Sequence, residues 1–178
     1  VDPDAAVEMK ECIQQARSDG ESVGGVVKAE VTGLPAGLGD PVFAKIDARL
    51  ARAIFSIGAV KGVEFGAGFR IASLQGSQNN DEMRDMQFLT NSAGGVLGGI
   101  SSGQPIIMRI GIKPTPSVSV AQRTCDTDGN NRMIKTEGRH DPCIAPRIVP
   151  VIESMIALVL LDAWEIQERI NPGWNENE

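Results

Sequence analysis

The segment Pro105–Lys113 constrains the fold more than any other, because its apolar and polar positions alternate with the period of a β-strand. Arg109 and Lys113 share one face with Ile107. The opposite face is formed by four large apolar residues, Ile106, Met108, Ile110 and Ile112. It is the clearest strand in the sequence, and its apolar face needs a second layer to cover it.

The most apolar stretch, Val149–Trp164, is the best candidate for a covering helix. Two acidic residues interrupt it and it is too short to cross a bilayer, so we interpret it as a core helix. Prolines precede it, and an interior proline removes a helical hydrogen bond. We therefore expect its regular part to begin near Arg147 or Pro150 and to end near Ile170.

Other elements follow from changes of period along the chain. The dipeptide Asp-Pro occurs at positions 2, 40 and 141, each time ahead of a helical pattern, and Asp is a favourable helix cap. The expected elements are a helix after Asp2 that ends at Gly20, a strand over 22–32, a helix over 46–57 that ends at Gly58, and a short strand over 61–65.

The remaining segments are more polar. Residues 76–86 have little apolar content, and we expect a mobile loop there. Residues 117–124 and 132–137 are strand candidates joined by the turn-forming Asp128–Asn131, which favours antiparallel pairing. Together these elements predict an α/β fold of the α+β type in a single domain spanning residues 1–178.

Charge and cysteine content narrow the function classes. The formal net charge of −6 argues against nonspecific nucleic-acid binding, which needs surplus lysine and arginine. Three cysteines without paired CxxC spacing signal neither a disulfide framework nor a zinc site, so we expect no metal and a reducing cytoplasm. The chain begins without a signal peptide and without methionine, which leaves open that it is part of a longer polypeptide.

The strongest site candidate is Gly138–Cys143, which contains the only histidine, His140, between Arg139 and Asp141. Asp141 is either a helix cap or a catalytic group, and periodicity favours the cap, although the prolines that follow push the regular helix away from it. A lone histidine is often structural. Arg139 beside it favours anion binding.

Two further segments have open interpretations. Asn91–Ile100 contains paired glycines that suit either a tight hairpin or a backbone facing a cofactor, and its spacing matches neither common phosphate-binding glycine motif. Lys113–Ser117 places a cation and two hydroxyls at the end of a strand, which suits phosphate but is also common in surface turns.

Taken together, these segments resemble the chorismate synthase family. The resemblance rests on Ala93–Ser101, Lys113-Pro114-Thr115, and Gly138–Cys143 followed by Pro146-Arg147 and Val149-Pro150-Val151, in that order and spacing. It extends to Asp47–Phe65, which contains Ser56–Glu64. Several motifs across most of the chain make the resemblance specific.

The resemblance implies a lyase of the shikimate pathway of aromatic amino-acid biosynthesis. This enzyme converts 5-enolpyruvylshikimate 3-phosphate to chorismate and phosphate by a 1,4-anti elimination that requires reduced FMN. It implies that Asp141 is catalytic and that Arg139 binds the substrate. The FMN contacts it implies are Asn91, Ser92, Ala93, Lys113, Thr115, Ser117, Arg139, His140 and Asp141.

The resemblance covers only the C-terminal half of the family, and the N-terminal half, with its Gly-Glu-Ser-His-Gly motif and catalytic histidines, is absent. The family fold implies an antiparallel sheet on helices, half of a β-α-β sandwich, in a homotetramer. We expect this chain alone to be inactive and either to self-associate or to expose an apolar surface. The alternatives are a noncatalytic assembly domain and a different phosphate-handling flavoprotein.

Overall fold

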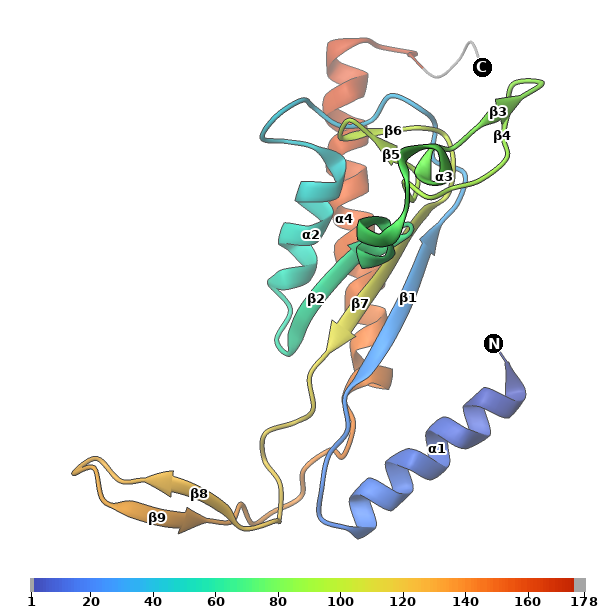
Figure 1. Ribbon diagram of the computed structural model, residues 1–178. Helices are drawn as coiled ribbons and strands as arrows, with labels where there is room; N and C mark the ends of the chain where they lie inside the picture. Colours follow the sequence, from blue (N-terminus) through green and yellow to red (C-terminus); the bar gives the residue numbers. More distant parts are fainter. Residues whose placement is uncertain (1, 175–178) are drawn as a thin grey trace. The chain divides into compact units, whose positions relative to one another are not determined.

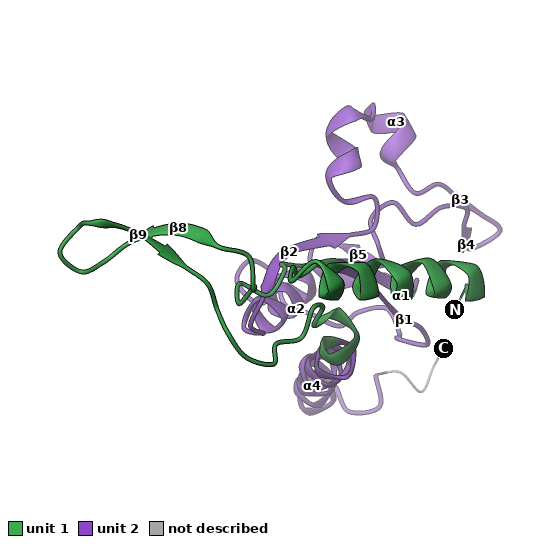
Figure 2. Ribbon diagram, turned by 90° about the horizontal axis from the view of Figure 1, so that it is seen from below, with its two compact units in different colours: residues 1–25, 112–148 green, residues 26–111, 149–178 purple. Residues whose placement is uncertain are grey.

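The computed structural model describes residues 2–174 of the chain. Contacts within the chain divide it into two compact units (Figure 2). Unit 1 joins the residues up to Gly25 with Ile112–Ile148, and unit 2 joins Val26–Gly111 with the residues from Val149 onward. The single domain expected over residues 1–178 stays a prediction, and each unit is described by itself.

Unit 2 is built on a three-stranded sheet in the order β1 (Gly25–Val31), β7 (Ile106–Ile112) and β2 (Val60–Phe65). The arrows in Figure 1 show β7 running antiparallel to both neighbours. Along β7 every second side chain is buried, and Ile106, Met108 and Ile110 are fully enclosed. The predicted strand is therefore confirmed as the centre of the sheet.

Two helices, α2 (Ile46–Phe55) and α4 (Ala145–Ile170), cover the apolar face of this sheet (Figure 1). Each helix buries apolar side chains at helical spacing, as an amphipathic helix on a sheet should. The buried helix residues are Ile46, Leu50 and Ile54 of α2 and Ile148, Ile152, Ile156, Leu160 and Ala163 of α4. An ion pair between Arg49 and Asp162 joins the two helices. The predicted arrangement of a sheet packed on helices is confirmed.

Of the three Asp-Pro dipeptides that suggested helix caps, one caps a helix and two do not. Asp2 caps α1 (Pro3–Ser18), and its carboxylate accepts from the backbone N–H groups of Asp4 and Ala5 at 2.9 and 3.2 Å. Asp40 and Asp141 cap nothing, because α2 begins at Ile46 and α4 at Ala145. Asp-Pro therefore also marks turns in this chain, since proline restricts the preceding residue to extended conformations.

The start of α4 lies two residues before Arg147, earlier than predicted, and the helix continues through Pro150. Pro146 falls in the first turn, where the missing N–H would be unpaired in any case. Pro150 removes a single hydrogen bond, and the apolar face that α4 buries outweighs that loss.

The glycine-rich segment forms a hairpin of β5 (Val96–Leu97) and β6 (Ile100–Ser101). Gly98 and Gly99 make its turn with φ angles of 60° and 92°, a conformation that favours glycine. The hairpin interpretation of this segment is confirmed.

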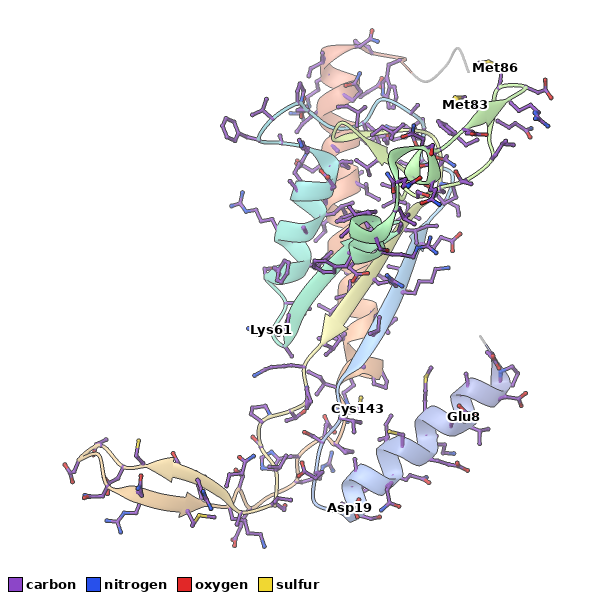
Figure 3. All side chains as sticks on the ribbon, viewed as in Figure 1. Glu8, Asp19, Lys61, Met83, Met86 and Cys143 are labelled. Carbon is purple, nitrogen blue, oxygen red and sulfur yellow. The ribbon has the colours of Figure 1, made fainter. Side chains whose placement is uncertain are left out.

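The predicted mobile loop at 76–86 is wrong. Those residues form the short helix α3 (Gly76–Asn79) and the strand β3 (Met83–Arg84), which pairs antiparallel with β4 (Gln87–Phe88). The side chains of Met83 and Met86 extend from this hairpin (Figure 3). The segment is ordered by hydrogen bonds rather than by an apolar core, so its composition gave no signal.

Unit 1 contains α1 and an antiparallel hairpin of β8 (Gln122–Cys125) and β9 (Asn131–Ile134). The predicted antiparallel pairing is confirmed, although both strands are shorter than expected. The turn is tied by Asp126, whose carboxylate accepts from Arg132 and from two backbone N–H groups. No helix within residues 2–174 is long and apolar enough to cross a membrane.

Candidate functional site

The site in unit 1 is organised by the segment Gly20–Gly24, which links α1 to β1 and receives two distant parts of the chain. The backbone N–H of Val23 donates to Pro142 O at 2.8 Å, and Ser119 N–H donates to Gly20 O at 2.8 Å. Ser22 Oγ donates to Thr115 O at 2.6 Å. These bonds bring the residues after β7 together with the residues before α4.

Gly24 allows the backbone of the Gly20–Gly24 segment to lie very close to the backbone of Ile112. A Cβ atom at this position would lie 2.4 Å from the carbonyl oxygen of Ile112, which real Cβ atoms do not tolerate. On the other side, Cys143 Sγ lies 3.9 Å from Gly24 O (Figure 3). The glycine therefore allows the backbones to pack without a gap.

The segments that meet here line a cavity of about 280 Å³. Four residues of the predicted site, Ser117, Arg139, His140 and Asp141, are among its lining residues, and their role in binding or catalysis stays a prediction. The lining also includes Ser119 and three residues from the end of α1 and the following turn, namely Arg17, Gly20 and Glu21.

Asp141 is half-buried in this cavity, and its Oδ1 pairs with Arg147 Nη2 at 3.1 Å. Because α4 begins at Ala145, the Asp141 carboxylate does not cap the helix. The cap interpretation is therefore excluded by the structure. The pair with Arg147 is exposed enough to add little stability, and it fixes the direction of the carboxylate.

The next feature of this region is the side-chain hydroxyl of Thr115. Its hydroxyl oxygen is buried and has no hydrogen bond within the described residues. A buried hydroxyl without a partner is costly, so such atoms often mark a place where a ligand binds. Lys113, at the end of the same segment, is exposed to solvent.

Asn91, Ser92 and Ala93 belong to unit 2, in the loop before β5. The Asn91 side chain bonds to backbone groups of unit 2: Nδ2 donates to Pro105 O, just before β7, at 2.8 Å, and Oδ1 accepts from Gly95 N–H at 2.7 Å. The structure therefore gathers Ser117, Arg139, His140 and Asp141 in one cavity. It places Asn91, Ser92 and Ala93 in unit 2.

Sequence reasoning missed the contribution of α1. Arg17 lies within the expected first helix and Glu21 follows its end at Gly20, and nothing in their spacing marks them as site residues. The available signal was Gly20, which ends the helix with a φ of 71° and turns the chain toward the cavity.

The cavity combines two guanidinium groups, an imidazole, two carboxylates and two hydroxyls. Such a lining can bind an anion through Arg17 and Arg139 while Asp141 exchanges a proton. No cluster of three or more metal-ligating side chains occurs within residues 2–174.

Comparisons with known proteins agree on one family. The family model of chorismate synthase matches residues 1–164. The chorismate synthase of Maridesulfovibrio salexigens is 54% identical over 169 residues, which are 95% of this chain and 48% of the relative. The chorismate synthase of Methanothermobacter thermautotrophicus is 51% identical over 183 residues, which are 99% of this chain and 49% of the relative.

A solved structure described as a crystal structure of chorismate synthase aligns with a TM-score of 0.73 and 34% sequence identity. The alignment covers 90% of this chain and 43% of the solved chain. This chain thus spans about half the length of the curated relatives it matches.

Proposed function

Because the chain belongs to the chorismate synthase family, we propose that it is the C-terminal half of a chorismate synthase and supplies one wall of the active site. The proposed reaction is the 1,4-anti elimination of phosphate from 5-enolpyruvylshikimate 3-phosphate to give chorismate, with reduced FMN as cofactor. The observation that carries the proposal is the cavity that joins Arg139, His140 and Asp141 with Ser117.

The residues present fit a flavin phosphate or ribityl chain. Thr115 precedes Ser117 but is not among the cavity-lining residues; its buried hydroxyl has no hydrogen-bond partner within residues 2–174 and can donate to an oxygen of such a group. Ser117 adds a second hydroxyl nearby in sequence, and the exposed ammonium of Lys113 adds a positive charge. By resemblance to the family, Asn91, Ser92 and Ala93 are proposed as further FMN contacts.

The chain's own residues would act by charge and by proton transfer. Arg139 binds an anionic group of the substrate through its planar guanidinium. Arg147 holds Oδ1 of Asp141, which leaves Oδ2 as the atom that exchanges a proton. Reduced FMN, when bound, supplies electron density to the elimination and takes part in removing the C6 proton. His140 lines the same cavity and contributes to the cofactor site.

Assembly and location complete the proposal. A family-length protein would supply the opposite wall of the site, and the family assembles as a homotetramer. We propose a cytoplasmic location, because three cysteines without CxxC spacing signal no disulfide framework. We propose no nucleic-acid or membrane partner.

The test uses a chimera in which this chain replaces the aligned segment of the M. salexigens chorismate synthase. Asp141→Asn in this chimera should lower turnover with reduced FMN by at least about 100-fold, because general acid–base catalysis contributes factors of that size. Asp128→Asn, an exposed acid in the β8–β9 turn, is the matched control and should leave turnover unchanged.

A noncatalytic assembly role is the second candidate. It is favoured by one observation, that the Asn91 amide is bonded to backbone groups of unit 2 rather than left free for a ligand. Unchanged turnover in the Asp141→Asn chimera would support this second role and contradict the proposed function.

A further inference from the structure

In unit 2, the carboxylate of Asp81 binds the loop Thr90–Gly95, which we call the 90–95 segment. Asp81 Oδ1 accepts from Thr90 Oγ1 at 2.7 Å and from Ser92 N–H at 2.6 Å. Its Oδ2 accepts from Ala93 N–H at 2.9 Å. One side chain therefore receives a hydroxyl and two consecutive backbone N–H groups of this segment.

These bonds close the β3–β4 hairpin at its base. Asp81 precedes the hairpin, Thr90 follows it, and Leu89 N–H donates to Glu82 O at 2.8 Å between them. Figure 3 shows Met83 and Met86 on the hairpin itself, beyond this closure. The two ends of the hairpin over 82–89 are thus hydrogen-bonded to each other at the point where the 90–95 segment begins.

The other side of the 90–95 segment is fixed by the sheet. Ala67 N–H donates to Ser92 O at 2.8 Å, and Ile107 N–H donates to Gly94 O at 3.2 Å. A Cβ on Gly94 would lie 2.3 Å from the backbone nitrogen of Gly66, so the two backbones are in direct contact. The segment is also bonded by Gln104 Nε2, which donates to Thr90 O at 2.7 Å, and by Ser102 N–H, which donates to Gly95 O at 3.0 Å.

The ionised form of Asp81 suits this role. Partial burial acts to raise the pKa of this carboxyl, but the hydrogen bonds from Ala93, Thr90 and Ser92 outweigh it and leave the pKa below its ordinary value. Hydrogen bonds to a charged acceptor are about twice as strong as neutral ones. A neutral amide at this position would keep the shape but lose that strength.

We infer that Asp81 is a positioning residue that pre-organises the 90–95 segment for the flavin. The inference rests on the proposed function, in which Asn91, Ser92 and Ala93 contact FMN. Because the Asp81 carboxylate already occupies the N–H groups of Ser92 and Ala93, these groups are not available to a flavin phosphate. The 90–95 segment then contacts the flavin as a rigid surface, and the position of this segment depends on Asp81.

The first measurement is amide hydrogen exchange in the 178-residue chain. Asp81→Asn places an NH₂ or a neutral oxygen against each donor, and Asp81→Ala removes every acceptor. We expect exchange at Ser92 and Ala93 to become at least about tenfold faster in both variants. Asp85→Asn is the matched control, since it removes the same charge at the exposed hairpin tip, where a φ of 51° suits asparagine.

The second measurement is the dissociation constant of reduced FMN, titrated anaerobically against the chimera. Asp81→Ala should weaken binding at least about tenfold and Asp81→Asn by a smaller factor, because the segment must be ordered when FMN binds. Asp85→Asn should bind as the unsubstituted chimera does.

The outcomes separate the two proposals. If the unsubstituted chimera binds no reduced FMN, the proposed function fails and this inference fails with it. If the chimera binds FMN and the Asp81 variants bind equally well, only the inference is overturned. Unchanged exchange at Ser92 and Ala93 in Asp81→Ala would overturn it as well.

Discussion

Within residues 2–174 the Thr115 hydroxyl is buried without a hydrogen-bond partner, so we expect its contribution to stability to differ between the free and the ligand-bound protein. Thr115→Val keeps the shape of the side chain and removes this oxygen. In the free chain the free energy of unfolding should stay the same or rise by up to about 1 kcal/mol, because an unsatisfied polar group is lost. Denaturant unfolding measures this change.

The same substitution should weaken the binding of reduced FMN to the chimera about five- to tenfold, because the ligand loses a hydrogen bond. Thr124→Val on the exposed strand β8 is the control for both measurements. A loss of stability in the free chain together with unchanged FMN affinity would show that Thr115 has a structural partner and no ligand.

The hydrogen bonds to Asp81 also predict a pH dependence of stability. The pKa of Asp81 in the folded chain lies below its ordinary value of 3.8, so between these two pKa values the unfolded state binds more protons. Its stabilising contribution is therefore complete above pH 3.8 and is lost as the pH falls through the folded pKa. Asp81→Asn should show a shallower loss of stability with acid below that pH in urea unfolding, and an identical slope would contradict the assignment.

Single residues were the hardest to predict from sequence. Arg139, His140 and Asp141 could be predicted as one site because adjacent ionisable side chains are visible in the sequence itself. Arg17 and Glu21 could not, because they reach the cavity only through hydrogen bonds that join Gly20–Gly24 to distant segments. The motif Asp-Pro suggested a helix cap at three positions, but only Asp2 caps a helix, α1. Asp40 and Asp141 lie several residues before α2 and α4 and cap neither helix.

At the scale of elements, α4 offers a matched pair of substitutions. Ile156 is 6% exposed and packs into the core, whereas Leu158, two residues on, is 61% exposed. In the isolated chain Ile156→Ala should lower the free energy of unfolding by about 2–5 kcal/mol, and Leu158→Ala should change it by less than about 0.5 kcal/mol. Equal effects in urea unfolding would contradict the assignment of the two faces of α4.

Elements with a clear hydrophobic period were predictable, and those without one were not. The alternation of β7 and the apolar stretch of α4 gave the sheet and its covering helix, because burial on one face leaves that pattern in the sequence. The hairpin β3–β4 has exposed strands and is ordered through Asp81 and backbone hydrogen bonds, so its polar composition indicated a loop.

At the scale of the whole molecule, the outward face of α4 remains apolar, with Val151, Leu158 and Leu161 each more than 40% exposed. Such a surface favours association. We predict that the isolated chain elutes with a mass above its own 18.9 kDa in light-scattering chromatography. The double substitution Leu158→Lys and Leu161→Lys should shift it toward the monomer, and a monomeric parent chain would contradict this prediction.

The central claim is that this chain carries one wall of a chorismate synthase site whose other wall lies in the remaining half of a family-length protein. Anaerobic assay of chorismate formation from 5-enolpyruvylshikimate 3-phosphate with reduced FMN tests it directly. The assay compares the chimera, the intact M. salexigens enzyme and the isolated chain at equal concentration. We expect turnover by the chimera and none by the isolated chain. Turnover by the isolated chain, or an inactive but folded chimera, would contradict it.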